Sequence, residues 1–235
     1  MAHASGQAYD FVDVNNSSVQ QFCAAGILEP LDSYLEADGI VLEENIGEAL
    51  LSVGQSDGSQ YAIPYSPDCR LLAYNKKILD EAGISPPETQ ADVLEIAEQL
   101  CGDGLYAFAR RFDTSLAPAY IEGCFFLGNN AYICSEEDGK IVASCNTPQM
   151  IESVKFWQDM VPYMPKDTNI NEEQEKQMFA QGKTIFFIYG PWNIADDFGE
   201  YGVDFDLMLT PKGSERNGAT AVICTRFSGH RLKNE

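Results

Sequence analysis

The strongest constraint on the fold is a strand pattern that passes through polar residues into a helical pattern. Residues 11–14 (Phe-Val-Asp-Val) are typical of a short β-strand, and small polar residues follow as a predicted loop: Asn15, Asn16, Ser17 and Ser18. Ser18 and Gln21 have the spacing of a capping box, and Gly26 can close the helix. This order predicts an α/β fold whose ligand-binding residues lie where strands end.

The same order recurs further along the chain. Residues 61–64 and 71–74 are predicted strands on either side of a polar loop, residues 65–68, which contains Asp68. A capping box at Thr89 and Asp92 starts a helix whose buried face is predicted to carry Val93, Leu94, Ala97 and Leu100. Residues 133–145 predict a hairpin that turns at Asp138-Gly139.

Three more elements complete the pattern. Thr147-Pro148 starts a helix with a predicted apolar face of Ile151, Val154, Trp157 and Val161. Residues 171–181 predict a polar helix closed by Gly182, and residues 184–188 a buried strand that ends at Tyr-Gly-Pro-Trp. Alternating strands and helices with one hairpin place the chain in the α/β class.

Charge restricts the partners. The chain has 36 acidic and 15 basic side chains, a formal net charge of −21. This field repels nucleic acid, anionic lipid surfaces and phosphorylated ligands, whereas neutral and cationic small molecules remain compatible with it. Solubility alone is also a sufficient explanation of the acidic excess.

Targeting and cysteine signals say little. The sequence has no run of eighteen apolar residues, and residues 1–6 lack the charged and apolar regions of a secretory signal, so these residues do not encode export. The seven cysteines form no Cys-x-x-Cys motif and no pairing with histidine. We predict that most are small core residues rather than disulfide partners, and we predict no metal site.

Motifs that resemble catalytic sites lack the necessary context. Residues 54–58 match Gly-x-Ser-x-Gly but precede a strand, so they are predicted to form a turn. Gly182-Lys183-Thr184 is predicted to be a helix cap rather than the end of a phosphate-binding loop. The acidic pairs Glu136-Glu137 and Asp196-Asp197 are typical of solvated surfaces. No catalytic residue is predicted.

Trp192 is the best candidate for a binding aromatic. Gly190 permits close approach of a ligand, and Pro191 can start a helix whose N–H groups face the strand end. A pyranose offers an apolar face to stack and hydroxyls to hydrogen-bond. The alternative, that Trp192 belongs to the core, stays open on composition alone.

A set of phrases in fixed order resembles a known family. The phrases span residues 12–31, 61–65, 74–77, 82–89, 179–183 and 190–192, among them Tyr-Ala-Ile-Pro-Tyr, Tyr-Asn-Lys-Lys, Phe-Ala-Gln-Gly-Lys and Gly-Pro-Trp. Together they resemble the extracellular solute-binding proteins of ABC importers, in the maltose-binding-protein-like sugar group. The chain differs from the pattern at Gln90, where a tryptophan is usual.

The resemblance implies a two-lobe α/β fold that closes on its ligand in a cleft. The expected division is residues 1–70 for the first lobe, 71–219 for the second and 220–235 for a return segment, with crossovers near residues 69–75 and 218–222. The first lobe is expected to be incomplete, because the family's opening strand–helix unit and its large C-terminal part have no counterpart in these residues.

The resemblance also implies a function and a site. It implies a monomeric carbohydrate receptor without cofactor, extracytoplasmic in the periplasm or as a cell-surface lipoprotein, with membrane permease subunits as partners. Asp68 resembles the carboxylate that binds sugar hydroxyls, and Trp192 the stacking aromatic beside Gly190. Asn15, Asn16, Ser17 and Ser18 resemble the binding loop of the first lobe. A glycoside hydrolase, and a receptor for polyamine or peptide, remain the alternatives.

Overall fold

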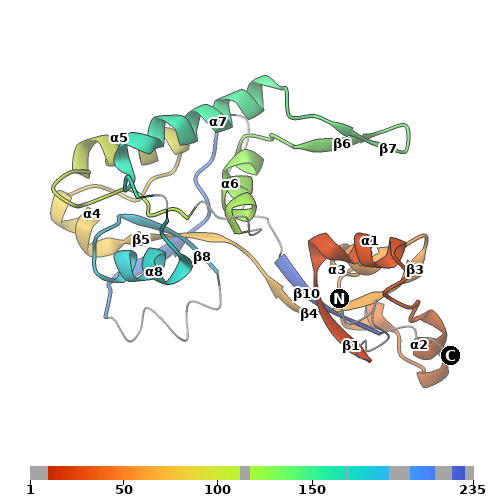
Figure 1. Ribbon diagram of the computed structural model, residues 1–235. Helices are drawn as coiled ribbons and strands as arrows, with labels where there is room; N and C mark the ends of the chain where they lie inside the picture. The colour runs from red at the N-terminus through yellow and green to blue at the C-terminus, as the bar shows by residue number, and fades with distance from the viewer. Residues whose placement is uncertain (1–9, 112–116, 168, 191–201, 215–223, 231–235) are drawn as a thin grey trace. The chain divides into compact units, whose positions relative to one another are not determined.

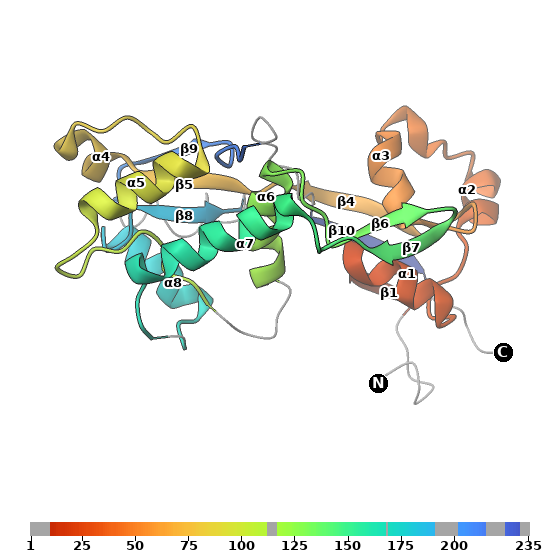
Figure 2. The same cartoon turned by 90° about the horizontal axis from the view of Figure 1, so that it is seen from above.

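The computed structural model describes residues 10–111, 117–167, 169–190, 202–214 and 224–230. The chain divides into two compact units, one made of residues 1–68 and 223–235 and the other of residues 69–222. Figures 1 and 2 show the helices and strands of both units. Each unit has its own sheet and its own buried core.

The first unit is built on an antiparallel sheet with strand order β1-β10-β4. Its strands are β1 (Phe11–Asn15), β10 (Cys224–His230) and β4 (Ala62–Asp68). Helix α1 (Asn16–Ala24) covers one face, where Val14, Val19, Leu28 and Ala62 are buried together. Smaller elements follow: α2 (Asp32–Asp38), η2 (Leu42–Glu44), α3 (Glu48–Leu51), η3 (Ser52–Gly54), β2 (Gln55–Ser56) and β3 (Ser59–Gln60).

The second unit has an antiparallel sheet with strand order β8-β5-β9, and helices cover both of its faces. The strands are β8 (Phe186–Tyr189), β5 (Leu71–Asn75) and β9 (Phe205–Met208). The other elements are α4 (Lys76–Ala82), α5 (Gln90–Leu100), α6 (Ala117–Gly128), β6 (Cys134–Glu137), β7 (Lys140–Ala143), α7 (Pro148–Met160), η4 (Val161–Tyr163) and α8 (Glu172–Ala180).

The alternation of side chains along β5 explains the two layers of helices. Leu72 and Tyr74 pack in the large core with α5, α6 and α7, whereas Ala73 packs with Phe179 of α8. In Figure 1, α5 and α7 accordingly lie on one side of β5 and α8 on the other. A sheet buried on both faces accounts for the nearly continuous apolar runs of β5 and β8.

The predicted helix starts and turns of the second unit are confirmed. Thr89 and Asp92 form a complete capping box, and Thr147 caps α7. Asp138 and Gly139 have φ of 51° and 74°, the left-handed pair that a tight hairpin turn requires. These features depend on residues close together in sequence, and local chemistry is sufficient to determine them.

The predicted polar loop at residues 15–18 is wrong. The helix begins at Asn16, so Asn16, Ser17 and Ser18 form its first turn. Asn15 is the extended N-cap residue, with φ −69° and ψ 145°, which also excludes the predicted capping box at Ser18. The strand passes directly into the helix because one extended residue is enough to change the backbone from β to α.

The predicted loop at residues 65–68 is also wrong, because β4 continues through it to Asp68. The extension pairs with β10, which returns from the far end of the chain. Only Cys69 and Arg70 separate β4 from β5. Pro67 does not prevent the pairing, since β4 is an edge strand of its sheet and proline is tolerated there.

Helix α7 buries a different face from the predicted one. Ile151, Val154 and Val161 are 61%, 52% and 60% exposed. The buried residues are Met150, Ser153, Phe156 and Met160, each one position before a predicted one. A shift of one residue turns the face by about 100°. Trp157, which was predicted to lie on the apolar face of this helix, is partly buried and packs against the core.

Three of the six described cysteines, Cys23, Cys101 and Cys124, belong to or pack against a buried core and three do not, so the prediction that most are core residues is met only in part. Cys124 is buried, Cys134 and Cys145 are exposed, and Cys23, Cys69 and Cys101 are half-buried. All six carry free thiols. Burial raises the pKa of the Cys101 thiol to about 12, which makes it a poor nucleophile.

Candidate ligand-binding site

Two predicted site residues, Asn15 and Asp68, lie at the same end of the first unit's sheet, where strands β1 and β4 finish. We call this end of the sheet its edge. Strand β10 is antiparallel to both β1 and β4, so β1 and β4 run in the same direction. Asn15 pairs with Arg226, and Asp68 pairs with Cys224, so both strands end at the edge where β10 begins. Asn15 is exposed, whereas the Asp68 side chain lies outside the described part of the structure.

The first turn of α1 adds main-chain donors to this edge. Asn16, Ser17 and Ser18 belong to that turn, and the Asn15 side chain does not cap the helix. Backbone N–H groups at a helix N-terminus point along the axis toward whatever lies beyond it, and they favour acceptor oxygens. The predicted loop residues therefore lie near Asn15, but they present a helix start rather than a flexible loop.

Tyr65, which sequence reasoning did not single out, lies on the same sheet. The register of β4 against β10 shifts between Arg226 and Phe227: Ser66 pairs with Arg226 and Pro64 with Phe227, which leaves Tyr65 as the extra residue of a β-bulge. The Tyr65 hydroxyl donates a hydrogen bond of 2.7 Å to Oδ2 of Asp13. A bulge depends on a strand more than 150 residues away, so no local signal could have revealed it.

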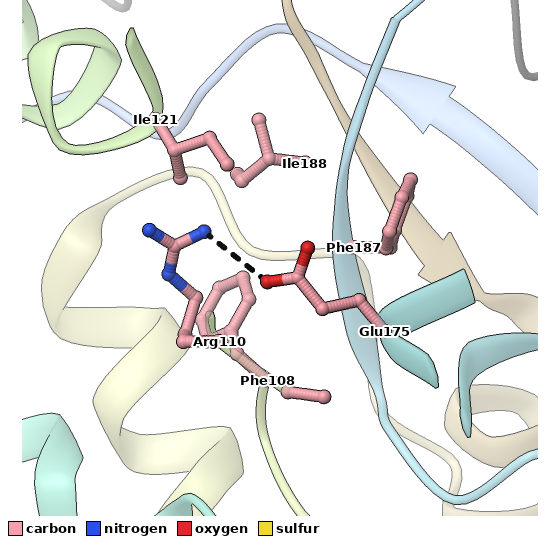
Figure 3. A pocket seen from close by; sticks show the side chains of 7 residues that line it. Phe108, Arg110, Ile121, Glu175, Phe187 and Ile188 are labelled. Atoms are coloured by element: carbon pink, nitrogen blue, oxygen red, sulfur yellow. Dashed lines mark ion pairs between the residues drawn. The ribbon is translucent and has the colours of Figure 1, made fainter. Parts of the chain in front are cut away.

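In the second unit, β8 ends at Tyr189 and is followed by Gly190, which is buried. Trp192, the predicted stacking aromatic, lies outside the residues that the structure describes. Close to the end of β8 is a small cavity lined by Phe108, Ala109, Arg110, Ile121, Glu175, Phe187 and Ile188 (Figure 3). Arg110 and Glu175 are its charged residues.

Arg110 connects three helices. Its side chain is only 3% exposed and forms ion pairs with Glu122 of α6 and, at 3.9 Å, with Glu175 of α8. Figure 3 shows the guanidinium turned toward the Glu175 carboxylate across the cavity. The guanidinium also lies 5.4 Å from the ring centre of Trp157 on α7, a cation–π contact. The Arg110-Arg111 pair after an apolar run, residues 105–109, was a visible sequence signal for such a network.

Glu175 is a buried carboxyl group with several hydrogen-bonding and ionic partners. Burial raises its pKa above the ordinary value and outweighs the two nearby guanidiniums, which act in the opposite direction. Its Oε1 accepts a 2.7 Å hydrogen bond from the backbone N–H of Arg111, whose side chain pairs with Glu172 at 2.7 Å. The network therefore fixes the backbone at Arg110 and Arg111 against α8.

The described residues offer hydrogen-bonding and aromatic groups rather than a metal centre. No group of three or more His, Cys, Asp and Glu side chains among them is arranged to hold a metal ion. Within the same part of the chain, every helix is too short or too polar to cross a membrane. Exposed carboxylate groups as acceptors, and amide, tyrosyl and main-chain N–H groups as donors, suit a neutral, hydroxyl-rich ligand.

Comparison with known families decides the classification. The family model for the bacterial extracellular solute-binding protein matches residues 1–225. The chain belongs to this family. The expected resemblance to sugar-binding proteins of ABC importers and the two-lobe α/β fold class are thereby confirmed.

Several relatives of this solute-binding protein carry saccharide names. It is 26% identical over 218 residues to the maltotriose-binding protein of Pyrococcus abyssi, covering 90% of this chain and 44% of that protein. It is 25% identical over 243 residues to a diacetylchitobiose binding protein of Streptomyces coelicolor, covering 96% of this chain and 55% of the relative. The chain therefore spans about half the length of these relatives.

A solved structure shares the fold. The ABC substrate-binding protein of Listeria monocytogenes in complex with cycloalternan superposes with a TM-score of 0.84 at 19% identity. The match covers 100% of this solute-binding protein and 60% of the Listeria chain. At this identity the likeness establishes the fold, and ligand and site must be argued from this chain's own residues.

Proposed function

We propose that this solute-binding protein binds a neutral saccharide as the extracytoplasmic receptor of an ABC importer. The observation that carries the proposal is the family match over residues 1–225, since relatives across that range are named for maltotriose and diacetylchitobiose. The net charge of −21 supports a neutral rather than an anionic ligand. The same charge would suit a cationic polyamine, which is the second candidate.

The proposed contacts with the saccharide are of two kinds, hydrogen bonds to its hydroxyls and stacking on its ring. Asp68 would accept hydrogen bonds from sugar hydroxyls at the edge where Asn15 also lies, and the first turn of α1, from Asn16 to Ser18, would donate main-chain N–H groups. Gly190 would allow a ligand to approach closely, and Trp192 would stack on a pyranose face.

The proposal extends to the lobes and partners. We assign the unit of residues 1–68 and 223–235 to the first lobe and the unit of residues 69–222 to the second. The receptor would act as a monomer, deliver its sugar to membrane permease subunits and leave the ligand chemically unchanged. It would need no cofactor and would have no role with nucleic acid.

Calorimetric titration of the 235-residue chain with maltotriose, diacetylchitobiose, glucose and spermidine tests the proposal. Saturable binding of at least one saccharide is expected, together with chromatography that recovers the sugar intact. Binding of spermidine alone would replace the saccharide receptor by a polyamine receptor. Protein-dependent appearance of shorter sugars would instead identify a glycoside hydrolase.

Asp68→Asn tests the site. The change keeps the size of the side chain but removes its charge, and hydrogen bonds to charged groups contribute about 1.5–3 kcal/mol each, so saccharide affinity should fall roughly ten- to a hundredfold. Asp57→Asn is the matched control, because Asp57 has φ 49° in the turn between β2 and β3, a conformation that asparagine accepts. Equal affinities of the two variants at unchanged melting temperature would remove Asp68 from the site.

A further inference from the structure

We propose that Tyr65 and Asp13 form a second saccharide subsite on the first unit, which holds a sugar ring beyond the one at Asp68 and so favours oligosaccharides over monosaccharides. The inference rests on the proposed function, because it assumes that Asp68 contacts a saccharide. It adds a residue pair that sequence patterns did not indicate, and it commits to a ligand longer than one ring.

The β-bulge determines which face of the sheet Tyr65 occupies. In a regular strand, residues three apart point to opposite faces, so Tyr65 and Asp68 would be separated by the sheet. The extra residue changes this, because both residues of a bulge oppose the same partner, here Arg226. Arg226 pairs with Asn15 on its other side. The register thus places Tyr65 on the face of Asn15.

The hydrogen bond from Tyr65 supports this placement independently. Asp13 lies two residues before Asn15 on β1 and therefore shares its face, opposite to the face where Val14 packs under α1. The Tyr65 hydroxyl reaches Oδ2 of Asp13 at 2.7 Å across the intervening strand β10. A tyrosine from one outer strand and an aspartate from the other thus meet on the face opposite to α1.

The chemistry of the pair suits a pyranose. Tyr65 is 54% exposed, so its ring offers apolar surface to solvent while the hydroxyl is held in place. A ring fixed by its own hydrogen bond loses little freedom when a ligand stacks on it. An ionised carboxylate can accept several hydrogen bonds, so Asp13 can bind the tyrosine hydroxyl and a sugar hydroxyl together.

The spacing along β10 gives the subsite its role. Asp13 pairs with Ser228 and Asp68 pairs with Cys224, four residues away, which is about 13 Å along a strand. This is longer than one sugar ring, so a ligand that contacts both aspartates must have at least two rings. A monosaccharide bound at Asp68 would not reach Asp13 or the Tyr65 hydroxyl bound to it.

Calorimetry of Tyr65→Ala against the parent tests the subsite, with maltotriose and glucose or, if the parent prefers it, diacetylchitobiose and N-acetylglucosamine. Loss of a stacking ring should weaken oligosaccharide binding about tenfold and leave the monosaccharide within about twofold. Tyr65→Phe, which keeps the ring, should retain most of the affinity. Tyr34→Ala is the matched control, since Tyr34 is also exposed and its hydroxyl donates to Glu29 at 2.9 Å.

The outcomes separate this inference from the function on which it rests. A parent that binds no saccharide overturns both. A parent that binds oligosaccharide, with Tyr65→Ala unchanged or no weaker than Tyr34→Ala, overturns the subsite alone. An equal loss for oligosaccharide and monosaccharide also overturns it, because Tyr65 would then act on the first ring. Unchanged melting temperatures confirm that the variants are folded.

Discussion

Replacing Phe125 with alanine is expected to lower the free energy of unfolding by about 3–5 kcal/mol, the usual cost of removing a fully buried aromatic ring. Phe125 is 0% exposed in the large core of the second unit. Its ring stacks on Phe156 at 5.0 Å and contacts Trp157 edge-on at 4.9 Å. Urea unfolding followed by circular dichroism measures the change.

Ile151→Ala is the control for this substitution. Ile151 is an apolar residue of the same unit, but it lies on the exposed side of α7, so its loss should change stability by less than about 0.5 kcal/mol. A large loss in Ile151→Ala would mean that this side of α7 is covered in solution. A small loss in Phe125→Ala would contradict the aromatic core itself.

Arg110→Ala is expected to destabilise the chain by about 3 kcal/mol at neutral pH, because it breaks a buried ion pair and leaves Glu175 with Arg111, at 3.7 Å, as its remaining cation. Glu175 would lose its ion pair at 3.9 Å, and Glu122 would lose its partner in the same step. Lys77→Ala is the contrasting control, since its pair with Glu81 is exposed and should contribute less than about 1 kcal/mol.

The pH dependence gives this prediction a definite sign. Burial holds the pKa of Glu175 above its ordinary value, so the folded chain binds this proton more tightly than the unfolded chain. The corresponding stability is present below the ordinary pKa and is lost as the pH rises through the raised one. Without Arg110 the pKa should rise further. The deficit of Arg110→Ala should therefore shrink in mildly acidic buffer, and a deficit independent of pH would contradict this account.

Local chemistry made several elements predictable from the sequence. The capping box at Thr89 and Asp92 and the turn at Asp138-Gly139 each involve residues within four positions of each other. The family phrases led to the correct family and fold class, because they are spread over nearly the whole matched range. Predictions of this kind need no knowledge of distant contacts.

The remaining features depend on contacts between residues far apart in the sequence, and sequence patterns could not predict them. Residues 65–68 contain two of the features typical of a loop, a proline and polar side chains, yet β10 pairs with them as a strand. The same pairing creates the bulge at Tyr65, so the loop error and the missed residue have one physical cause. The buried face of α7 was missed because apolar residues occur on both sides of that helix, and the neighbouring helices select one of them.

The structure describes the positions of several predicted site residues, whereas their binding of a ligand stays a prediction. Asn15 and Asp68 are the last residues of β1 and β4, which end on the same side of the sheet with β10 between them. The charged cavity at Arg110 and Glu175 required two residues 65 positions apart to come together, and neither has a motif. Trp192 stays a prediction, since it lies outside the residues that the structure describes.

The direct passage from β1 into α1 has an implication for mutational scans and for sequence drift. The donors at this sheet edge are main-chain N–H groups, which every residue type except proline carries. Alanine replacements at Asn16, Ser17 and Ser18 would leave those groups in place, so a scan of side chains would report little there. Evolution can change these three residues freely while the edge keeps its hydrogen-bonding pattern, provided that the helix still starts at the same position.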